Sequence, residues 1–413
     1  MEEIFQKKLE EYARLLVEVG MNVQPGQTTR INTPVECAPL ARLCTQMALE
    51  RGARDVLVDW TDDFVTRQRY LKADDSAFSQ FPAYLKGKFD WLMEQGCTNL
   101  SIVGADPEML LGVDPDRIQS WQRTSGQPLK PWYDAMGAGQ YQWCVAAHPT
   151  VAWAEKAFPQ KKGQQAVAAL WDAIFTACRI TGDGRAVERW QAHTRAMTRR
   201  AELLNQYRFV CLHYTNSLGT DLTIRLPENH VWMGGSEQTP AGVPFVANLP
   251  TEEIFTAPRW DGVDGRVYAS LPLALDGNLV KDFYLDFREG RIVEVHAAEG
   301  EEILRCSITM DEGSSYLGEV ALVPHHSPIR NMGILFYETL FDENASCHLA
   351  FGSAYPTCVQ GGEKLDGEGQ KALGLNQSIN HVDFMIGTAD LSIVGITPDG
   401  QKIPVFVDGN FAF

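Results

Sequence analysis

The sequence has a deficit of positive charge and lacks several motifs that would assign a function at once. Its 413 residues include 36 Lys or Arg against 53 Asp or Glu, a formal charge of −17, which argues against nucleic acid or an anionic membrane as a partner. No Gly-x-Gly-x-x-Gly and no Gly-x-x-x-x-Gly-Lys-Ser/Thr occurs, so nothing supports a nucleotide-binding role. The absence of His-Glu-x-x-His excludes the single-zinc site of thermolysin-type enzymes and metzincins.

Long apolar runs and paired cysteines are also missing. No stretch approaches the roughly 18 apolar residues that a membrane span needs, and the N-terminus is charged throughout, so we expect neither a membrane partner nor a secretion signal. The nine cysteines are odd in number and form no Cys-x-x-Cys, which is typical of reduced thiols rather than of a disulfide framework. We therefore expect a cytoplasmic protein.

The first half of the chain alternates helical and strand-like segments. Helices are expected near 2–20, 35–51, 164–178 and 184–205, and strands near 28–33, 54–60, 98–104 and 142–147. Strands separated by helices are typical of a parallel sheet that is covered on both faces. Because a chain of 413 residues exceeds one ordinary core, we predict a separate N-terminal α/β domain with a mainly parallel sheet over residues 1–183.

The second half consists mainly of short strands. They are expected near 209–214, 220–226, 265–271, 291–296 and 393–396, separated by turn signals such as Asp276-Gly277-Asn278. One helix is expected at 329–342. We predict that residues 184–413 form an α+β, antiparallel-rich domain, and the candidate metal ligands described next make it the metal-binding catalytic domain.

A strand-like run over residues 379–387 presents an imidazole and a carboxylate together. Side chains two residues apart in a strand point to the same face, so His381 and Asp383 should share one side. The alternate residues should pack the other side: Val382, Phe384 and Ile386. This pair suits a divalent cation such as zinc, cobalt or manganese. Alone it is a weak signal, but further candidate ligands in the same half make a metal site the stronger interpretation.

Two acidic segments supply further candidates. Glu252 and Glu253 lie in an extended segment, where neighbours face opposite ways, so only one should enter a site. A helix start capped by Thr251 is equally compatible with this segment. Glu319 lies in an apolar strand and by period shares a face with Leu317; a carboxylate there needs a cation or a partner arginine.

The remaining candidates follow the expected helix. Glu343 and His348 flank a four-residue segment, and His348 alone is more typical of a buried, hydrogen-bonded histidine than of a ligand. Tyr355 lies in a loop, where a tyrosine is usually a packing residue, but beside a metal its hydroxyl can stabilise an oxyanion. The neighbours His325 and His326 are poorly placed to chelate one ion together, and we assign them to the surface or to the surroundings of the site.

Four segments together resemble the aminopeptidase T, aminopeptidase S and PepS family of metallopeptidases. They are Asn-Leu-Pro-Thr-Glu-Glu-Ile-Phe-Thr-Ala-Pro from residue 248, Tyr-Leu-Gly-Glu-Val from 316, Phe-Asp-Glu-Asn-Ala-Ser-Cys-His-Leu-Ala-Phe-Gly from 341 and Asn-His-Val-Asp-Phe-Met-Ile-Gly from 380. The resemblance extends over the whole chain, and the four motifs in this order are specific.

The resemblance implies a site and an activity. It implies that two divalent metals are held, with Glu319 as the bridge, by six residues: Glu253, Glu319, Glu343, His348, His381 and Asp383. Tyr355 matches the active-site tyrosine of the family. The family further implies a homodimer and a broad specificity for the N-terminal residue of a peptide substrate.

The expected function is that of a metal-dependent aminopeptidase. Two ions can share a water and lower its pKa, and Glu253 or Glu252 would act as the general base. Such ligands serve zinc, cobalt, manganese or magnesium, and the sequence does not choose among them. Two alternatives stay open: a two-metal hydrolase of a phosphoester or a cyclic amide, and a non-catalytic ligand-binding protein with a structural metal.

Overall fold

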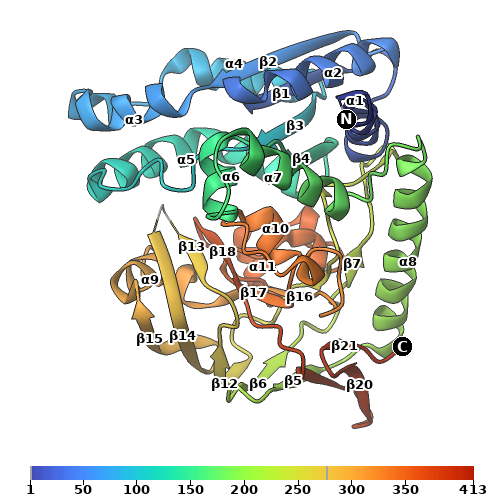
Figure 1. The fold of residues 1–413 in the computed structure, drawn as a ribbon. Coiled ribbons are helices and arrows are strands. Elements are labelled where there is room, and N and C mark those ends of the chain that lie inside the picture. The colour runs from blue at the N-terminus through green and yellow to red at the C-terminus, as the bar shows by residue number, and fades with distance from the viewer. Residues whose placement is uncertain (1, 276–277) are drawn as a thin grey trace. The chain divides into compact units, whose positions relative to one another are not determined.

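The computed structural model describes residues 2–275 and 278–413, which pack as two compact units (Figure 1). The first unit runs to His193 and includes the returning segment Ser236–Pro250, and the second holds Thr194–Gly235 and Thr251–Phe413. The turn expected at residues 276–278 involves Asp276 and Gly277, which lie outside the described residues. The domain boundary expected between residues 183 and 184 stays a prediction. Among the described helices, none combines the length and the apolar character that a bilayer span requires.

A five-stranded parallel sheet forms the centre of the first unit. Its order is β10-β4-β3-β1-β2, and every neighbouring pair is parallel. Four strands lie where the sequence predicts them, whereas β10 comes from the returning segment and is too short to leave a sequence pattern. The strands of this unit are β1 (Thr28–Pro34), β2 (Asp55–Thr61), β3 (Thr98–Val103), β4 (Trp143–Ala147) and β10 (Asn248–Leu249), with a small hairpin of β8 (Glu237–Gln238) and β9 (Pro244–Phe245).

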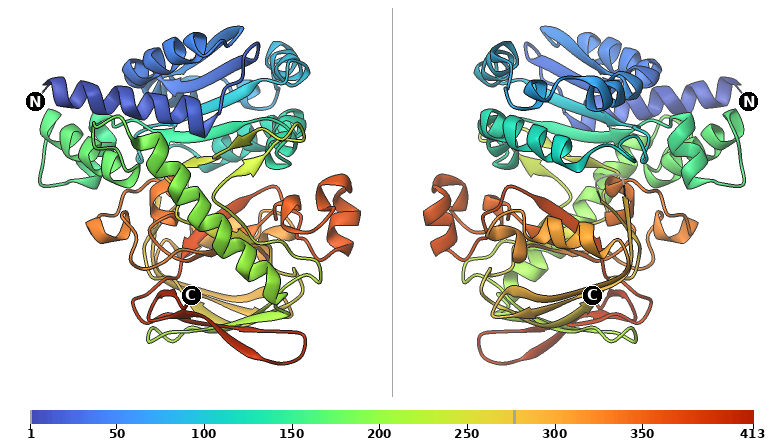
Figure 2. Two further views of the ribbon diagram at one scale, coloured as in Figure 1. Left: turned by 90° about the vertical axis from the view of Figure 1, so that its right-hand side faces the viewer. Right: turned by 90° about the vertical axis from the view of Figure 1, so that its left-hand side faces the viewer.

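Helices cover both faces of this sheet (Figures 1 and 2). One face is apolar and buried, with Ile31 of β1 and Leu100 of β3. The other face is polar: Arg30 of β1 donates to Asp59 at 2.6 Å and its guanidinium lies over the Phe89 ring of α4. The helices are α1 (Glu2–Leu15, continued by a π turn at Leu16–Gly20), α2 (Ala38–Glu50), α3 (Asp63–Lys72), α4 (Ala83–Glu94), α5 (Pro115–Gly137), α6 (Val151–Ala157) and α7 (Gln164–Ala177); α8 (Ala186–Tyr207) begins in the first unit and ends in the second.

The second unit contains two antiparallel sheets. The smaller has the order β18-β17-β16-β11-β7, and the larger has the order β13-β14-β12-β6-β5-β19-β20-β21 with β15 paired to β14. The smaller sheet is built from β7 (Met233–Gly234), β11 (Ile254–Thr256), β16 (Leu317–Leu322), β17 (His348–Gly352) and β18 (His381–Met385). The larger is built from β5 (Cys211–Thr215), β6 (Asp221–Arg225), β12 (Val263–Tyr268), β13 (Leu273–Leu275), β14 (Asn278–Arg288), β15 (Arg291–Glu299), β19 (Ser392–Ile396), β20 (Lys402–Val407) and β21 (Asn410–Phe411).

The helix expected at residues 329–342 is wrong for most of its length. The structure has a short 3₁₀ turn at Arg330–Met332 and then no helix until α10 (Thr339–Glu343). Gly333 and Tyr337 both have positive φ, at 63° and 57°, which an α-helix does not allow. The carboxylate of Asp342 accepts the N–H groups of Phe336 at 2.8 Å and Glu338 at 3.2 Å, and thereby takes backbone donors that a helix would use.

The expected fold class is confirmed. A parallel α/β unit is followed by an antiparallel-rich unit, whose helices besides α8 are α9 (Glu301–Ile308), α10 and α11 (Gly367–Ala372). One apolar core underlies both sheets of the second unit, with Phe384 of β18 and Phe283 of β14 in contact at 5.9 Å between ring centroids. This core supports the strands that carry the candidate metal ligands.

The first unit contains a histidine that should make stability depend on pH. Burial lowers the pKa of His148 from 6.5 to about 4. Its ring packs against Trp171, and the carbonyl of Pro149 at Nδ1 only partly offsets the effect of burial. At a pH between these two values, His148 therefore binds a proton in the unfolded chain but not in the folded chain. The contribution of neutral His148 to stability is present above pH 6.5 and is lost as the pH falls towards 4.

We expect His148→Asn to reduce this dependence. The free energy of unfolding of the natural chain should drop between pH 7 and pH 5 by about 2 kcal/mol more than that of the variant. Chemical denaturation at the two pH values measures the difference. An identical drop in both proteins would show that His148 is not neutral in the folded chain.

Candidate metal centre

Four neighbouring strands of the smaller sheet bring the predicted ligands together. Glu319 lies in β16, His348 begins β17, and His381 and Asp383 lie in β18, while Glu253 directly precedes β11. These strands are adjacent in the sheet order β18-β17-β16-β11. Residues that are far apart in the chain thus become lateral neighbours.

The register of the sheet points these side chains to one face. Ala350 of β17 pairs with Glu319 on one side and with Asp383 on the other, so the three side chains form a row. His348 and His381 are each two residues from a member of this row and share its face. The opposite face belongs to the apolar core, which includes Leu349, Phe351 and Phe384. The alternation predicted for β18 is confirmed.

A β-bulge at Gly318 turns Glu319 towards the site. The pairing of β16 with β17 shifts between Leu317 and Glu319, and Leu317 packs into the apolar core. The expectation that Leu317 shares a face with Glu319 is therefore wrong. Only glycine fits at 318, because a Cβ there would overlap the carbonyl oxygens of Gly352 and Ser353.

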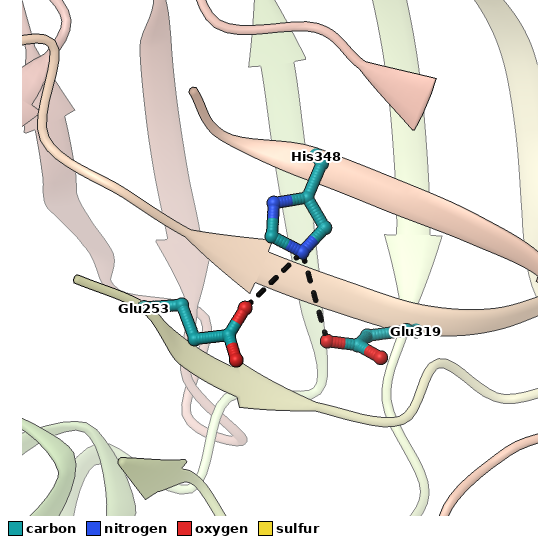
Figure 3. A group of neighbouring side chains, drawn as sticks. All are labelled: Glu253, Glu319 and His348. Carbon is teal, nitrogen blue, oxygen red and sulfur yellow. Dashed lines mark ion pairs between the residues drawn. The ribbon is translucent and has the colours of Figure 1, made fainter. Parts of the chain in front are cut away.

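The ligand atoms form two groups that share Glu319. In the first, His348 Nε2 lies 3.3 Å from Glu253 Oε2 and 3.8 Å from Glu319 Oε1 (Figure 3). In the second, His381 Nε2 lies 3.2 Å from Glu319 Oε2 and 3.3 Å from Asp383 Oδ1. Within each group one ligand atom per residue lies within 4.8 Å of the others, close enough to surround one ion.

Backbone carbonyls orient both imidazoles. His348 Nδ1 lies 3.0 Å from the carbonyl oxygens of both Glu343 and Ser346, and His381 Nδ1 lies 2.7 Å from that of Ser353. A carbonyl only accepts hydrogen bonds, so Nδ1 carries a proton in each ring. Each Nε2 therefore faces the carboxylates, in the orientation that a metal-ligating histidine adopts.

The charges of the group call for a cation. Burial raises the pKa of Glu319, and the carboxylates of Asp383 and Glu253 raise it further against the opposing effect of His381. Burial alone would lower the pKa of His348. The nearby carboxylates, Glu253 above all and then Asp383 and Glu319, outweigh burial and raise this pKa to about 10. In the described part of the chain, the ion pairs of this group join only its own carboxylates and imidazoles. The oxygen and nitrogen donors therefore fit divalent ions.

Glu343 and Tyr355 lie around these two groups. Burial raises the pKa of Glu343 well above its usual value, and the carboxylates of Asp383 and Glu253 raise it further. The Glu343 carboxylate therefore lies close enough to these two carboxylates to interact with them electrostatically. Glu343 belongs to neither of the two groups. The Tyr355 ring lies 5.2 Å from the His381 ring and 5.9 Å from that of Phe255, and burial and the carboxylates raise its pKa well above the usual value. Its hydroxyl is therefore protonated and able to donate.

Several local alternatives are resolved. Residues 251–253 form no helix and lead directly into β11, so the helix start capped by Thr251 is wrong. Glu253 enters the first group, whereas Glu252 is buried and its N–H donates to Asn344 Oδ1 at 2.8 Å. The ion-pair partners of Glu319 are the two histidines rather than an arginine.

The pair His325 and His326 lies apart from the two groups. Neither histidine belongs to them, and His326 is exposed. The rings of the pair lie 5.7 Å apart.

Sequence reasoning did not identify the groups that hold the ligands in place. The carbonyls of Ser353, Glu343 and Ser346 orient the imidazoles, and no residue type signals such a role because every residue has a carbonyl. Asn344 is buried between Glu252 and α10, and its place inside the third family motif was the only signal.

Carboxylate and imidazole donors on one face of a sheet are typical of a metal-dependent hydrolase. The chain belongs to the thermophilic metalloprotease (M29) family, whose profile matches residues 5–411. Membership in a metalloprotease family implies a divalent metal cofactor, as the sequence predicts.

Individual relatives match the chain over nearly its full length. It is 44% identical to aminopeptidase AmpS of Bacillus subtilis (strain 168), over 99% of both chains. It is 42% identical to aminopeptidase 2 of Geobacillus stearothermophilus, over 99% of this chain and 98% of the relative. Among solved structures, wild-type AmpT from Thermus thermophilus is 37% identical and superposes with a TM-score of 0.92, over 99% of this chain and all of that one.

The bulge at Gly318 yields a test of the site. We expect Gly318→Ala to destabilise the second unit by about 1–3 kcal/mol and to lower its metal content, because the added methyl group would push Ser353 away from His381 and turn Glu319. Thermal unfolding and metal analysis after dialysis measure both effects. The matched control is Gly367→Ala in α11, where the methyl group would make ordinary contacts with the Gln377 side chain, the nearest at 3.4 Å to Oε1. Natural metal content in Gly318→Ala would contradict the role given to the bulge.

Proposed function

We propose that this chain removes N-terminal residues from peptides by means of two divalent ions, with Glu319 as the bridge between them. The chain is a metallo-aminopeptidase: its family is a metalloprotease family, and relatives that match it from end to end are named aminopeptidases. The observation that carries the two-ion arrangement is the orientation of Glu319. Its Oε1 faces His348 and its Oε2 faces His381, so one carboxylate serves both groups.

The ligand assignment follows the two groups. Glu253 and His348 would hold one ion with Glu319 Oε1, and His381 and Asp383 would hold the other with Glu319 Oε2. Glu343 would complete the set, because its carboxylate interacts with those of both Asp383 and Glu253. When bound, two such ions supply a water of lowered pKa and polarise the scissile carbonyl.

The residues of the chain supply proton transfer and orientation. Glu253 is our choice for the general base: its Oε2 faces His348, which leaves Oε1 to take the proton from the attacking water and to deliver it to the leaving amine. Glu252 is the less suitable choice, because it lies outside both groups.

Tyr355 would donate a hydrogen bond to the oxyanion of the tetrahedral intermediate. Burial and the nearby carboxylates keep its phenol protonated, and the flanking rings of His381 and Phe255 hold it in place. The bond would strengthen as negative charge develops on the carbonyl oxygen, so it would act mainly on the transition state.

The proposal also covers the identity of the ions, the oligomeric state and the cellular compartment. Zinc, cobalt, manganese and magnesium all suit these ligands, and we propose a homodimer on the strength of the family resemblance. All nine cysteines are free thiols, which fits the reducing cytoplasm.

The deciding experiment compares Leu-p-nitroanilide with its N-acetylated form. Protein stripped by a chelator should be inactive, and zinc, cobalt, manganese or magnesium added back should restore cleavage of the free-amine substrate only. Cleavage of both substrates would rule out an aminopeptidase. Failure of every metal to restore cleavage, in folded protein that binds metal, would favour a hydrolase of another bond or a binding protein.

Two substitutions separate metal binding from oxyanion stabilisation. We expect Glu319→Gln to lose metal and activity together, because Glu319 belongs to both groups. Tyr355→Phe should keep its metal and lower kcat by about 10²- to 10³-fold with little change in KM. Steady-state kinetics with metal analysis test both. A tyrosine variant that loses metal, or one whose defect lies in KM, would count against the assigned role.

A further inference from the structure

Asn344 connects two segments that carry candidate ligands. Its side chain is fully buried, its Oδ1 accepts the N–H of Glu252 at 2.8 Å, and its Nδ2 donates to the carbonyl of Leu340 at 2.9 Å. Nδ2 also lies 3.4 Å from Glu343 Oε1. One amide thus contacts the segment that leads to Glu253 and the helix that carries Glu343, although residues 252 and 344 are 92 positions apart.

The segment that follows Asn344 orients His348. The carbonyls of Glu343 and Ser346 both accept from His348 Nδ1, so the ring depends on the path of residues 343–346. Asn344 lies inside this path and follows α10 directly, and its Nδ2 donates to the carbonyl of Leu340 in that helix. The Asn344 amide therefore fixes both the end of α10 and the start of the backbone segment 343–346 that orients His348.

The second group of ligands is held by other residues. His381 is oriented by the carbonyl of Ser353, and the backbone two residues before it is fixed by Asp311, whose Oδ2 accepts the N–H of Ile379 at 2.8 Å. Within the described part of the chain, the side-chain hydrogen bonds of Asn344 go to Glu252, Leu340 and Glu343 and do not reach these residues. A change at Asn344 should act on Glu253 and His348 far more than on His381 and Asp383.

We propose that Asn344 is a positioning residue that sets the separation of Glu253 and His348 and thereby the affinity of one of two metal ions. The inference rests on the proposed function, since it assigns these side chains to metal binding. An amide suits the position because it accepts from Glu252 and donates to Leu340 at once. An aspartate would keep the shape, but it would place a second carboxylate against Glu343 and lose the donor.

The test is metal titration of the stripped, full-length protein by calorimetry with zinc and with manganese. The natural chain should bind two ions. Asn344→Ala and Asn344→Asp should each bind one ion with natural affinity and the other about 10- to 100-fold more weakly, and excess metal should restore much of the lost peptide cleavage. The aspartate variant keeps the volume of the side chain, which protects the test against simple failure to fold.

Asn205→Ala is the matched control for stability. Asn205 also binds two backbone groups of a distant residue, donating to the Trp232 carbonyl at 2.9 Å and accepting its N–H at 2.8 Å, and it contacts no candidate ligand. This variant should lose thermal stability and keep the natural affinity for both ions.

The outcomes distinguish this inference from the proposed function. Natural affinity for both ions in the two Asn344 variants, equal weakening of both ions, or tighter binding by Asn344→Asp would each overturn the positioning role. A natural chain that binds metal but does not cleave Leu-p-nitroanilide would overturn the proposed function, while selective weakening of one ion would still support the role of Asn344.

Discussion

The second unit is organised around the balance of charge in a group of largely buried carboxylates. Asp383 and Glu253 lie close enough to Glu319 and Glu343 to raise the pKa values of both. The ion-pair partners of Glu253, Glu319 and Asp383 are two histidines. Burying such charges is unfavourable unless a cation or a proton compensates them. The bulge at Gly318, the carbonyls that orient the rings and the apolar core beneath the sheet hold the group where a cation can do so.

Much of this arrangement could be predicted from the sequence. The alternation in β18 placed His381 and Asp383 on one face because a strand has a period of two, and the four principal strands of the parallel sheet carry clear apolar patterns between helices. The acidic and histidine candidates were recognisable by their chemistry. Their combination in one site depended on the four family motifs in order, since no single residue signals a neighbour that is distant in the chain.

The features that could not be predicted arise from specific contacts, some between distant segments and some local, that a periodic sequence pattern does not reveal. The bulge at Gly318 reverses the face of Leu317, and its cause is the approach of Gly352 and Ser353 from another strand. The helix expected at 329–342 fails because Asp342 competes for backbone N–H groups, which a helical periodicity does not reveal. Ligand orientation by carbonyls is likewise invisible in a sequence, because it depends on the backbone path alone.

The returning segment has a consequence for the order of folding during synthesis. β10 pairs with β4, and the segment is also tied to the start of the chain, where Asn22 donates to the carbonyl of Pro244 and Val246 donates to that of Gly20. Residues 236–250 leave the ribosome only after much of α8 and the first strands of the second unit. The nascent first unit therefore exposes the free edge of β4 until then, and a fragment that stops at residue 193 would keep that edge open permanently.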